Sequence, residues 1–343
     1  MNHYRLALVG FGNVGQALAR LLLRKQDQLQ KQYELTFTVT GIFTGRHGAA
    51  IDPQGIPLDR ALADIREGGM LDPLSARPAP QNGVDFIRAC PADVLFEVTP
   101  VNHHTGQPAI DHLRAALEAG MHAITANKGP VVHGYQLLEE TARRSGRKFR
   151  FESAVMDGAP IFSLFRETLP AADLAGFRGI LNSCTNLILT RMEQGETFDQ
   201  AVAYAQSIGI AETDPSADVD GWDAAIKVAA LATVLMGAPL TPQQVDRHGI
   251  REITPQMLAQ ACREGKRWKL VCTARREGAA VRGRVAPETV SPDSPLYSIN
   301  GTSSYAQFEM DVLPGLGIVE SDPSPETTAF GLLADFLNVT RQG

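Results

Sequence analysis

The stretch from Glu212 to Lys227 concentrates side chains that could bind a cation or transfer a proton. Five carboxylates within twelve positions precede one lysine: Glu212, Asp214, Asp218, Asp220, Asp223 and then Lys227. Asp220 fits a helix N-cap, which places Asp223 in the first helical turn. Asp223 and Lys227 are four residues apart, so they share a helix face and can pair. Such a cluster can hold an α-ammonium group while the lysine acts as acid or base; the alternative is a solvated loop with ordinary capping.

A second chemical pattern lies near the N-terminus, where Gly10-Phe11-Gly12-Asn13-Val14-Gly15 follows the apolar run Tyr4–Val9 and opens a helical pattern. Gly10 allows a tight turn, Gly12 lets the backbone approach a pyrophosphate, and Gly15 permits close helix packing. The helix N-terminus adds the positive end of its dipole. Strand, glycine loop and helix in this order predict a dinucleotide site.

The residues after the second expected strand, Leu35–Phe43, bear on the choice of cofactor. An NAD site usually has an acid there to bind the ribose hydroxyls, but this chain reads Thr44-Gly45-Arg46-His47. An arginine at this position can bind a 2′-phosphate. The sequence therefore favours NADP(H) over NAD(H); the alternative is that Arg46 is a solvated loop residue.

The first half of the chain alternates strands and helices. Asp93–Val98 and His122–Thr125 read as strands, and Ile110–Ala119 reads as a helix between them. This order predicts an α/β fold with an N-terminal Rossmann domain, a doubly wound parallel sheet. Lys128 follows the strand that ends at Thr125, on the carboxyl edge where such sheets bind ligands, so it can reach a cofactor or substrate oxygen. A plain surface position is the alternative.

Beyond about residue 150 the pattern predicts a second, α+β domain. Its expected strands are Phe149–Val155, Phe177–Asn182, Arg267–Ala274, Ala280–Val285 and Ala306–Val312, and its expected helices are Pro160–Glu167, Phe198–Ile208 and 221–235. We expect domains at 1–148 and 149–312, and a C-terminal segment, 313–343, whose helix Pro325–Leu337 returns to the first domain.

Composition narrows the class of protein. A length of 343 residues suits about two domains. A net charge of -6 without basic runs argues against a nucleic-acid partner, and the apolar runs are too short to span a membrane. The chain shows no leader signature, and its four cysteines lack metal-ligand spacing. We expect a cytoplasmic protein with a small-molecule substrate.

Several blocks together resemble homoserine dehydrogenases, in family order and over almost the whole chain. They are the glycine fingerprint, Thr125–Lys128, Phe151–Val155, Gly179–Asn182 with Thr185-Asn186, and, most specifically, the Glu212 to Lys227 series. The resemblance implies reversible, nicotinamide-dependent interconversion of L-homoserine and L-aspartate 4-semialdehyde, a step toward threonine and methionine. It also implies a homodimer, with 1–148 binding the dinucleotide and 149–312 serving dimerisation and substrate binding.

The resemblance also assigns roles to residues. Lys227 is cast as the catalytic proton donor, oriented by Asp223 and assisted by Lys128, while Glu212 and Asp218, with Asp223 and Lys227, bind the substrate. The candidate cofactor-binding residues are Gly10, Gly12, Asn13, Val14, Gly15, Arg46, Thr99, Lys128 and Gly209. Backbone carbonyls that match a family sodium site belong to Glu152, Val155, Asp157 and Ala159.

Three segments depart from the family pattern: Ser183-Cys184 after Asn182, Met156-Asp157, and Ser321–Pro325. They leave open a related dehydrogenase that acts on another small amino or hydroxy compound. A nucleotide-sensing regulator without turnover is a further alternative, against which Lys128 and Lys227 argue. The chain ends soon after residue 337, so we expect the short form without aspartate kinase or ACT domains.

Overall fold

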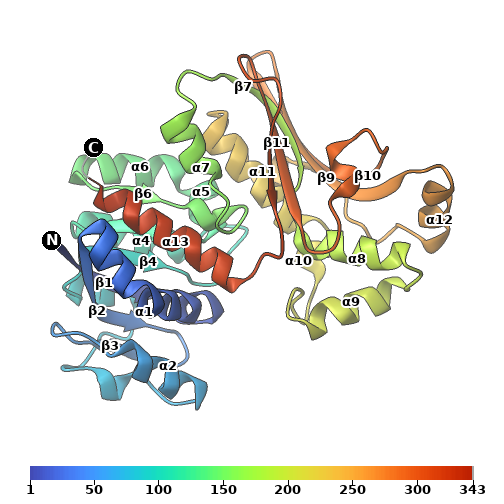
Figure 1. Ribbon diagram of the computed structural model, residues 1–343. Coiled ribbons are helices and arrows are strands. Elements are labelled where there is room, and N and C mark those ends of the chain that lie inside the picture. Colours follow the sequence, from blue (N-terminus) through green and yellow to red (C-terminus); the bar gives the residue numbers. More distant parts are fainter. Residues whose placement is uncertain (342–343) are drawn as a thin grey trace. The chain divides into compact units, whose positions relative to one another are not determined.

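The protein consists of two α/β units (Figure 1). The computed structural model describes residues 1–341. Unit 1 comprises Met1–Pro160 together with the chain from Ser324 onward, and unit 2 comprises Ile161–Pro323. Within the described residues, no helix is both long enough and apolar enough to cross a membrane.

Unit 1 is built on a six-stranded sheet in the order β3-β2-β1-β4-β5-β6. Its strands are β1 (Asn2–Val9), β2 (Leu35–Phe43), β3 (Ala49–Ile51), β4 (Val94–Glu97), β5 (His122–Thr125) and β6 (Phe149–Arg150). All pairs are parallel except β2 with β3. The expected Rossmann sheet is confirmed, and its strand order reverses between β1 and β4, which is where such folds bind dinucleotides.

Helices cover both faces of this sheet. They are α1 (Asn13–Tyr33), α2 (Leu58–Arg66), α3 (Gly83–Ala89), α4 (Ala109–Glu118), α5 (Lys128–His133), α6 (Tyr135–Ser145) and α13 (Pro325–Thr340). Leu6 and Leu8 of β1 join an apolar cluster with residues of α1 and α13, whereas the alternate residues Ala7 and Val9 join a cluster with α3 and α4. The strand is therefore buried on both sides, as the unbroken apolar run indicates.

The C-terminal helix α13 belongs to the core of unit 1 and packs along α1 (Figure 1). Phe336 is fully buried. Its ring lies edge-on to Tyr4 at 5.8 Å and to Phe96 at 6.0 Å between centroids. A segment far along the sequence thus fills the groove beside the first strand.

Unit 2 is built on a second six-stranded sheet in the order β12-β11-β7-β9-β10-β8. The strands are β7 (Leu174–Ile180), β8 (Asp246–Arg247), β9 (Arg267–Glu277), β10 (Ala280–Val290), β11 (Ser304–Met310) and β12 (Leu316–Glu320). The strand pairs are antiparallel except β8 with β10. The helices are α8 (Ser183–Glu193), α9 (Phe198–Ser207), α10 (Ser216–Val219), α11 (Trp222–Leu235) and α12 (Pro255–Arg263), of which α8, α11 and α12 pack against the sheet.

Some expected elements were wrong in extent. The strand expected over Phe149–Val155 ends at Arg150, because Glu152–Ala154 turns into a 3-10 helix. The helix expected over Pro160–Glu167 is a single turn, α7 (Ile161–Ser163), that continues as a π-helical turn over Leu164–Thr168. The strand expected to reach Asn182 ends at Ile180, because Asn182 caps the next helix.

Candidate active site

The glycine loop of unit 1 has the geometry that its sequence predicts. Gly10 has φ +100°, and a Cβ on it would lie 2.5 Å from the carbonyl oxygen of Val98. A Cβ on Gly15 would lie 2.5 Å from the carbonyl oxygen of Gly10. A Cβ on Gly12, by contrast, meets nothing within 4 Å. Gly15 therefore closes the loop against its own backbone, Gly10 packs against the chain just after β4, and Gly12 leaves an open approach.

The first turn of α1 fits a phosphate. Gly12 is the N-cap and has no side chain that could bond to the amides of the turn, which begins with Asn13, Val14 and Gly15. No acidic residue lies in that turn. Uncapped amides and an unopposed helix dipole favour an anion. The loop thus fits the pyrophosphate of a dinucleotide.

Arg46 lies exposed on the loop after β2, and it makes no hydrogen bond or ion pair within residues 1–341. The loop itself is fixed. The backbone amide of Thr44 donates to the carbonyl of Gly48 at 2.9 Å, and the amide of His47 donates to the Thr44 hydroxyl at 2.7 Å. A fixed loop therefore presents the guanidinium at the carboxyl end of β2.

Thr99 and Lys128 lie on the same carboxyl edge of the sheet, after β4 and β5. Thr99 is half-buried and Lys128 is the first residue of α5. Asn127 caps α5, since its side-chain oxygen accepts from the Gly129 amide at 3.0 Å, and its amide donates to the Thr99 carbonyl at 3.2 Å. The two predicted cofactor residues are thus joined through one asparagine.

In unit 2, Asn182 holds two of the predicted acids together. Its Nδ2 donates to Asp218 Oδ1 at 2.7 Å and to Asp223 Oδ2 at 2.9 Å. Its Oδ1 accepts from the Thr185 amide at 2.7 Å and so caps α8. Because one amide group fills both functions, the acids of α10 and α11 are fixed to the start of α8.

Lys227 joins this cluster from the next turn of α11. Its Nζ lies 3.0 Å from Asp223 Oδ2 and donates to the Leu181 carbonyl at 2.7 Å. The side chains of Lys227 and Asp223 are 14% and 13% exposed, so the pair is largely desolvated yet reachable from solvent. The predicted pairing of Asp223 with Lys227 is present in the structure.

Burial changes the acidity of this cluster. It raises the pKa of the Asp218 carboxyl above its ordinary value of 3.8, and the Asp223 charge raises that pKa further. The hydrogen bond from Asn182 and the Lys227 charge oppose the rise. Burial, together with the Asp218 charge, also raises the pKa of the Cys184 thiol. Because the site is poorly hydrated and Asp223 carries the same charge, a cation bound beside Asp218 would stabilise its ionised carboxylate.

The other acids of the stretch do not share the Asn182 donor. Glu212 and Asp214 are exposed. The expectation that Asp220 caps α11 was wrong: the N-cap is Gly221 at φ +80°, and the Asp220 carboxylate instead pairs with Arg251. A glycine in the left-handed region turns the chain between α10 and α11, so no side-chain cap is used there.

Gly209, a predicted cofactor residue, is exposed just after α9 with φ +75°. Its amide donates to the Gln206 carbonyl at 3.0 Å. This is the left-handed position at which helices commonly end, and it accounts for a glycine there.

The segment with the predicted cation-binding carbonyls is fastened to α13 within unit 1. The Glu152 amide donates to Asp335 Oδ2 at 2.7 Å. Asp157 has φ +39°, and its carboxylate accepts from the hydroxyls of Thr327 at 3.1 Å and Thr328 at 2.9 Å. Among residues 1–341, no group of three or more His, Cys, Asp or Glu side chains is arranged to hold a metal.

Two groups of the cluster were missing from the predicted site: the Asn182 amide and the Leu181 carbonyl. A signal for the first was present, because asparagine before the helical pattern 183–193 is a strong N-cap candidate. No sequence signal marks the Leu181 carbonyl, because every residue type has a backbone carbonyl. Only the tertiary fold, which brings Lys227 of α11 to the chain just after β7, selects it.

Comparison with known proteins identifies the family. The model for the NAD-binding domain of homoserine dehydrogenase matches residues 10–152, and the homoserine dehydrogenase model matches residues 160–337. A homoserine dehydrogenase of Methanocaldococcus jannaschii is 38% identical, covering 97% of this chain and 98% of its own. An NAD(+)-dependent homoserine dehydrogenase of Pseudomonas canavaninivorans is 36% identical, covering 99% and 97%. The crystal structure of a putative homoserine dehydrogenase from Archaeoglobus fulgidus superimposes with a TM-score of 0.86 at 30% identity, covering 98% of each chain.

Asn182→Asp should destabilise the protein in a pH-dependent way. The variant keeps the α8 cap but replaces the shared donor with a third carboxylate, which should cost roughly 1–3 kcal/mol at pH 7. The pKa of Asp218 is already raised in the folded state, so stability falls as pH rises from its ordinary value through the raised one. Urea unfolding should therefore show a smaller loss at pH 5 than at pH 7.

Asn182→Ser is the matched control, because serine also caps a helix and adds no charge. Because it removes the donor to Asp218 without adding a carboxylate, its loss of stability should rise less between pH 5 and pH 7 than that of Asn182→Asp. An equal pH dependence in both variants would contradict the role of Asn182 as the shared donor of two carboxylates.

Proposed function

The chain belongs to the homoserine dehydrogenase family, oxidoreductases that act on a CH–OH group with NAD(P), and we propose that it interconverts L-homoserine and L-aspartate 4-semialdehyde. The observation that carries the proposal is the cluster of Asp218, Asp223 and Lys227 around Asn182. It combines groups that can bind an ammonium with one that can move a proton.

In the proposed mechanism, unit 1 binds the nicotinamide cofactor, which accepts or supplies the hydride. Unit 2 binds the amino-acid part of the substrate, with Glu212 and Asp218 bonding to its polar groups. Hydride addition to the aldehyde creates an alkoxide, which the Lys227 ammonium stabilises and protonates. In the oxidising direction the same lysine, in its neutral form, takes the hydroxyl proton and becomes the ammonium. Asp223, 3.0 Å away, orients Lys227 and stabilises its ammonium form, and Lys128 assists in placing the substrate oxygen.

Purified protein should reduce cofactor only when homoserine is present, and Lys227→Ala should lose most of this turnover. Removal of a general acid costs roughly two to four powers of ten in kcat. Cofactor affinity should stay unchanged, because Lys227 lies in the substrate unit. Absorbance of the reduced cofactor follows the reaction.

Lys266→Ala is the matched control, since Lys266 is a partly exposed lysine of unit 2 that pairs with Glu264. It should keep full turnover. A Lys227→Ala enzyme with near-normal kcat would show that Lys227 is not the acid. Turnover of another amino or hydroxy compound but not homoserine would favour a related dehydrogenase, and tight cofactor binding without any turnover would favour a sensor.

For the cofactor we propose NADP(H) in preference to NAD(H). The support is Arg46, exposed without an ion pair within residues 1–341, and the absence of an acid after β2. A relative of 36% identity carries the name NAD(+)-dependent, so the two cofactors need direct comparison.

Arg46→Ala should weaken NADPH binding roughly tenfold or more and leave NADH binding almost unchanged, because a charge-assisted bond to the 2′-phosphate is lost. Calorimetric titration of the free enzyme gives both dissociation constants. Arg143→Ala on α6, another exposed arginine of unit 1, is the control and should change neither. Equal losses for both cofactors would mean that Arg46 does not bind the phosphate.

We also propose a sodium ion on the carbonyls of Glu152, Val155, Asp157 and Ala159. The proposed carbonyls come from one tight turn, in which Phe151 accepts from Ala154 at 3.0 Å and Met156 accepts from Ala159 at 2.8 Å. Uncharged oxygen ligands suit a hard monovalent cation.

Sodium should raise the thermal unfolding midpoint and the turnover rate relative to potassium or choline at one ionic strength. An ion that binds only the folded state stabilises it by mass action. Differential scanning calorimetry in the three chloride salts measures the effect. Identical midpoints and rates in all three salts would rule out the proposed sodium site.

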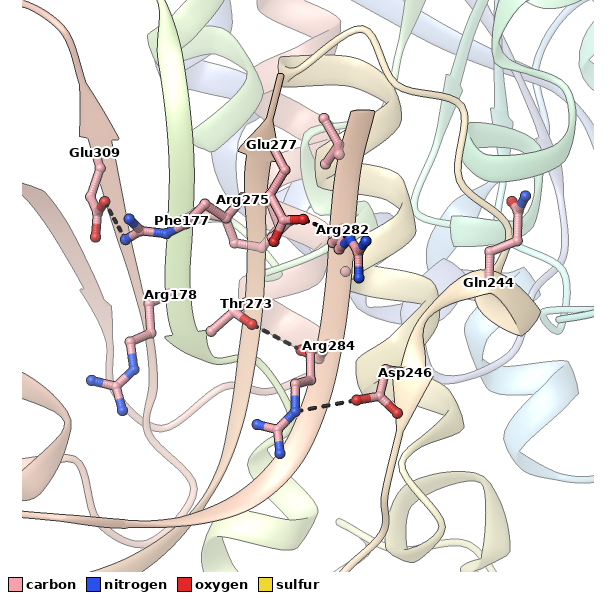
Figure 2. A pocket seen from close by; sticks show the side chains of 13 residues that line it. Phe177, Arg178, Gln244, Asp246, Thr273, Arg275, Glu277, Arg282, Arg284 and Glu309 are labelled. Atoms are coloured by element: carbon pink, nitrogen blue, oxygen red, sulfur yellow. Dashed lines mark hydrogen bonds and ion pairs between the residues drawn. The ribbon is translucent and has the colours of Figure 1, made fainter. Parts of the chain in front are cut away.

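For assembly we propose a homodimer that forms through the sheet face of unit 2 opposite its helices. Figure 2 shows Arg178, Arg275, Arg282 and Arg284 along neighbouring strands, around a hollow of about 530 Å³. Each arginine pairs with an acid of the same face, for example Arg275 with Glu309 at 2.7 Å. A face that carries both signs in rows can meet its own copy across a two-fold axis. None of Glu212, Asp218, Asp223 and Lys227 lines this hollow.

Sedimentation equilibrium should give twice the chain mass of 37.0 kDa for the wild type. Arg275→Glu with Arg284→Glu should shift it toward the monomer, because like charges would then meet across the axis. Arg143→Glu in unit 1 should leave the mass unchanged. A dimer that survives the double reversal would place the interface elsewhere.

A further inference from the structure

A fully buried carboxylate, Glu97, ends strand β4 in unit 1. Its Oε1 accepts two hydrogen bonds from Thr99, one from the backbone amide at 3.0 Å and one from the hydroxyl. Its Oε2 accepts from the Thr125 hydroxyl at 2.8 Å. A buried carboxylate destabilises the fold unless it is hydrogen-bonded in this way. A carboxylate at this position therefore indicates a role beyond core packing.

The bonds of Glu97 extend across the carboxyl edge of the sheet. The Thr125 hydroxyl oxygen accepts from the backbone amide of Asn127 at 2.9 Å. The Asn127 side chain donates to the Thr99 carbonyl and caps α5. One carboxylate therefore fixes the ends of β4 and β5 to each other. The only basic group within 4 Å of Glu97 among residues 1–341 is His112, whose Nδ1 lies 3.9 Å away, beyond hydrogen-bond distance.

This edge adjoins the glycine loop. A Cβ on Gly10 would lie 2.5 Å from the Val98 carbonyl oxygen and 3.0 Å from the Thr99 amide nitrogen. Thr99 thus lies at the point between β1 and β4 where the strand order reverses, and its side chain is half-buried, not enclosed. A dinucleotide that binds across this crevice passes Thr99.

The hydroxyl of Thr99 has a single hydrogen, and that hydrogen is donated to Glu97. The Thr99 oxygen can then only accept a bond from a ligand. The nicotinamide ring carries a carboxamide whose NH₂ donates. We propose that Glu97 is a positioning residue that fixes the Thr99 hydroxyl as an acceptor for this carboxamide NH₂. The inference rests on cofactor binding to unit 1, which is part of the proposed function.

The test compares two cofactors that differ in this donor alone. In 3-acetylpyridine adenine dinucleotide (phosphate) a methyl ketone replaces the carboxamide, so the acceptor on Thr99 has no partner. Calorimetric titration of the full-length enzyme without homoserine gives the ratio of the two dissociation constants. The wild type should bind the carboxamide cofactor about tenfold more tightly, the equivalent of one hydrogen bond.

Two pairs of variants separate positioning from structure. Thr99→Val should bring the ratio close to one, whereas Thr99→Ser, which keeps the hydroxyl, should preserve it. Glu97→Met keeps the size and removes the group that orients the Thr99 hydroxyl, so the ratio should fall clearly below the wild-type value. Glu97→Gln can accept from only one of the two threonines, and the ratio should fall part of the way.

A wild-type ratio in Thr99→Val would overturn the contact with the carboxamide. If Glu97→Met kept the wild-type ratio, Glu97 would support the fold only. Should Glu97→Met not fold, a wild-type ratio in Glu97→Gln would lead to the same conclusion. Because homoserine is absent from the titration, a protein that binds cofactor but fails to oxidise homoserine would disprove the proposed activity and leave this inference standing.

Discussion

One side-chain amide, that of Asn182, makes the candidate site of unit 2 possible. Two carboxylates in a poorly hydrated pocket repel each other, and Asp218 and Asp223 stay together because both accept from the same Nδ2. The oxygen of that amide caps α8, so the ends of β7, α8, α10 and α11 are fixed at one point. Lys227 pairs with Asp223, so its single positive charge offsets only one of the two carboxylates. The arrangement favours an added cation, which is what an amino-acid substrate brings.

In unit 1 as well, a buried carboxylate needs partners that stabilise its charge. Its polar groups gather on the carboxyl edge of the sheet, where Glu97 is satisfied by Thr99 and Thr125 instead of by a cation. The rest of the unit keeps this edge in place, since β1 is buried on both faces and α13 packs on α1. Each unit therefore holds its hydrogen-bonded acids on an apolar scaffold, at the end of β4 in unit 1 and on α10 and α11 in unit 2.

The sequence predicted those features that depend on local pattern. The glycine fingerprint, the β5 strand and the first turn of α11 with Asp223 follow from residue type and spacing. The chain between Arg150 and Thr168 was misread, because its apolar residues suit a strand or a helix and only tertiary bonds such as Asp157 to Thr328 choose the turn. The convergence of Asn182 on Asp218 was also beyond sequence reasoning, since 36 residues separate them and no local rule joins them.

The central claim is that this family member moves a hydride directly between homoserine and the nicotinamide ring while Lys227 handles the proton. Homoserine carrying two deuterium atoms on its hydroxyl-bearing carbon tests the hydride transfer most directly. Mass spectrometry of the reduced cofactor and of the aldehyde should find one deuterium on the nicotinamide and one left on aspartate 4-semialdehyde for each turnover. An unlabelled reduced cofactor, or no homoserine-dependent reduction with either NADP+ or NAD+, would contradict the account.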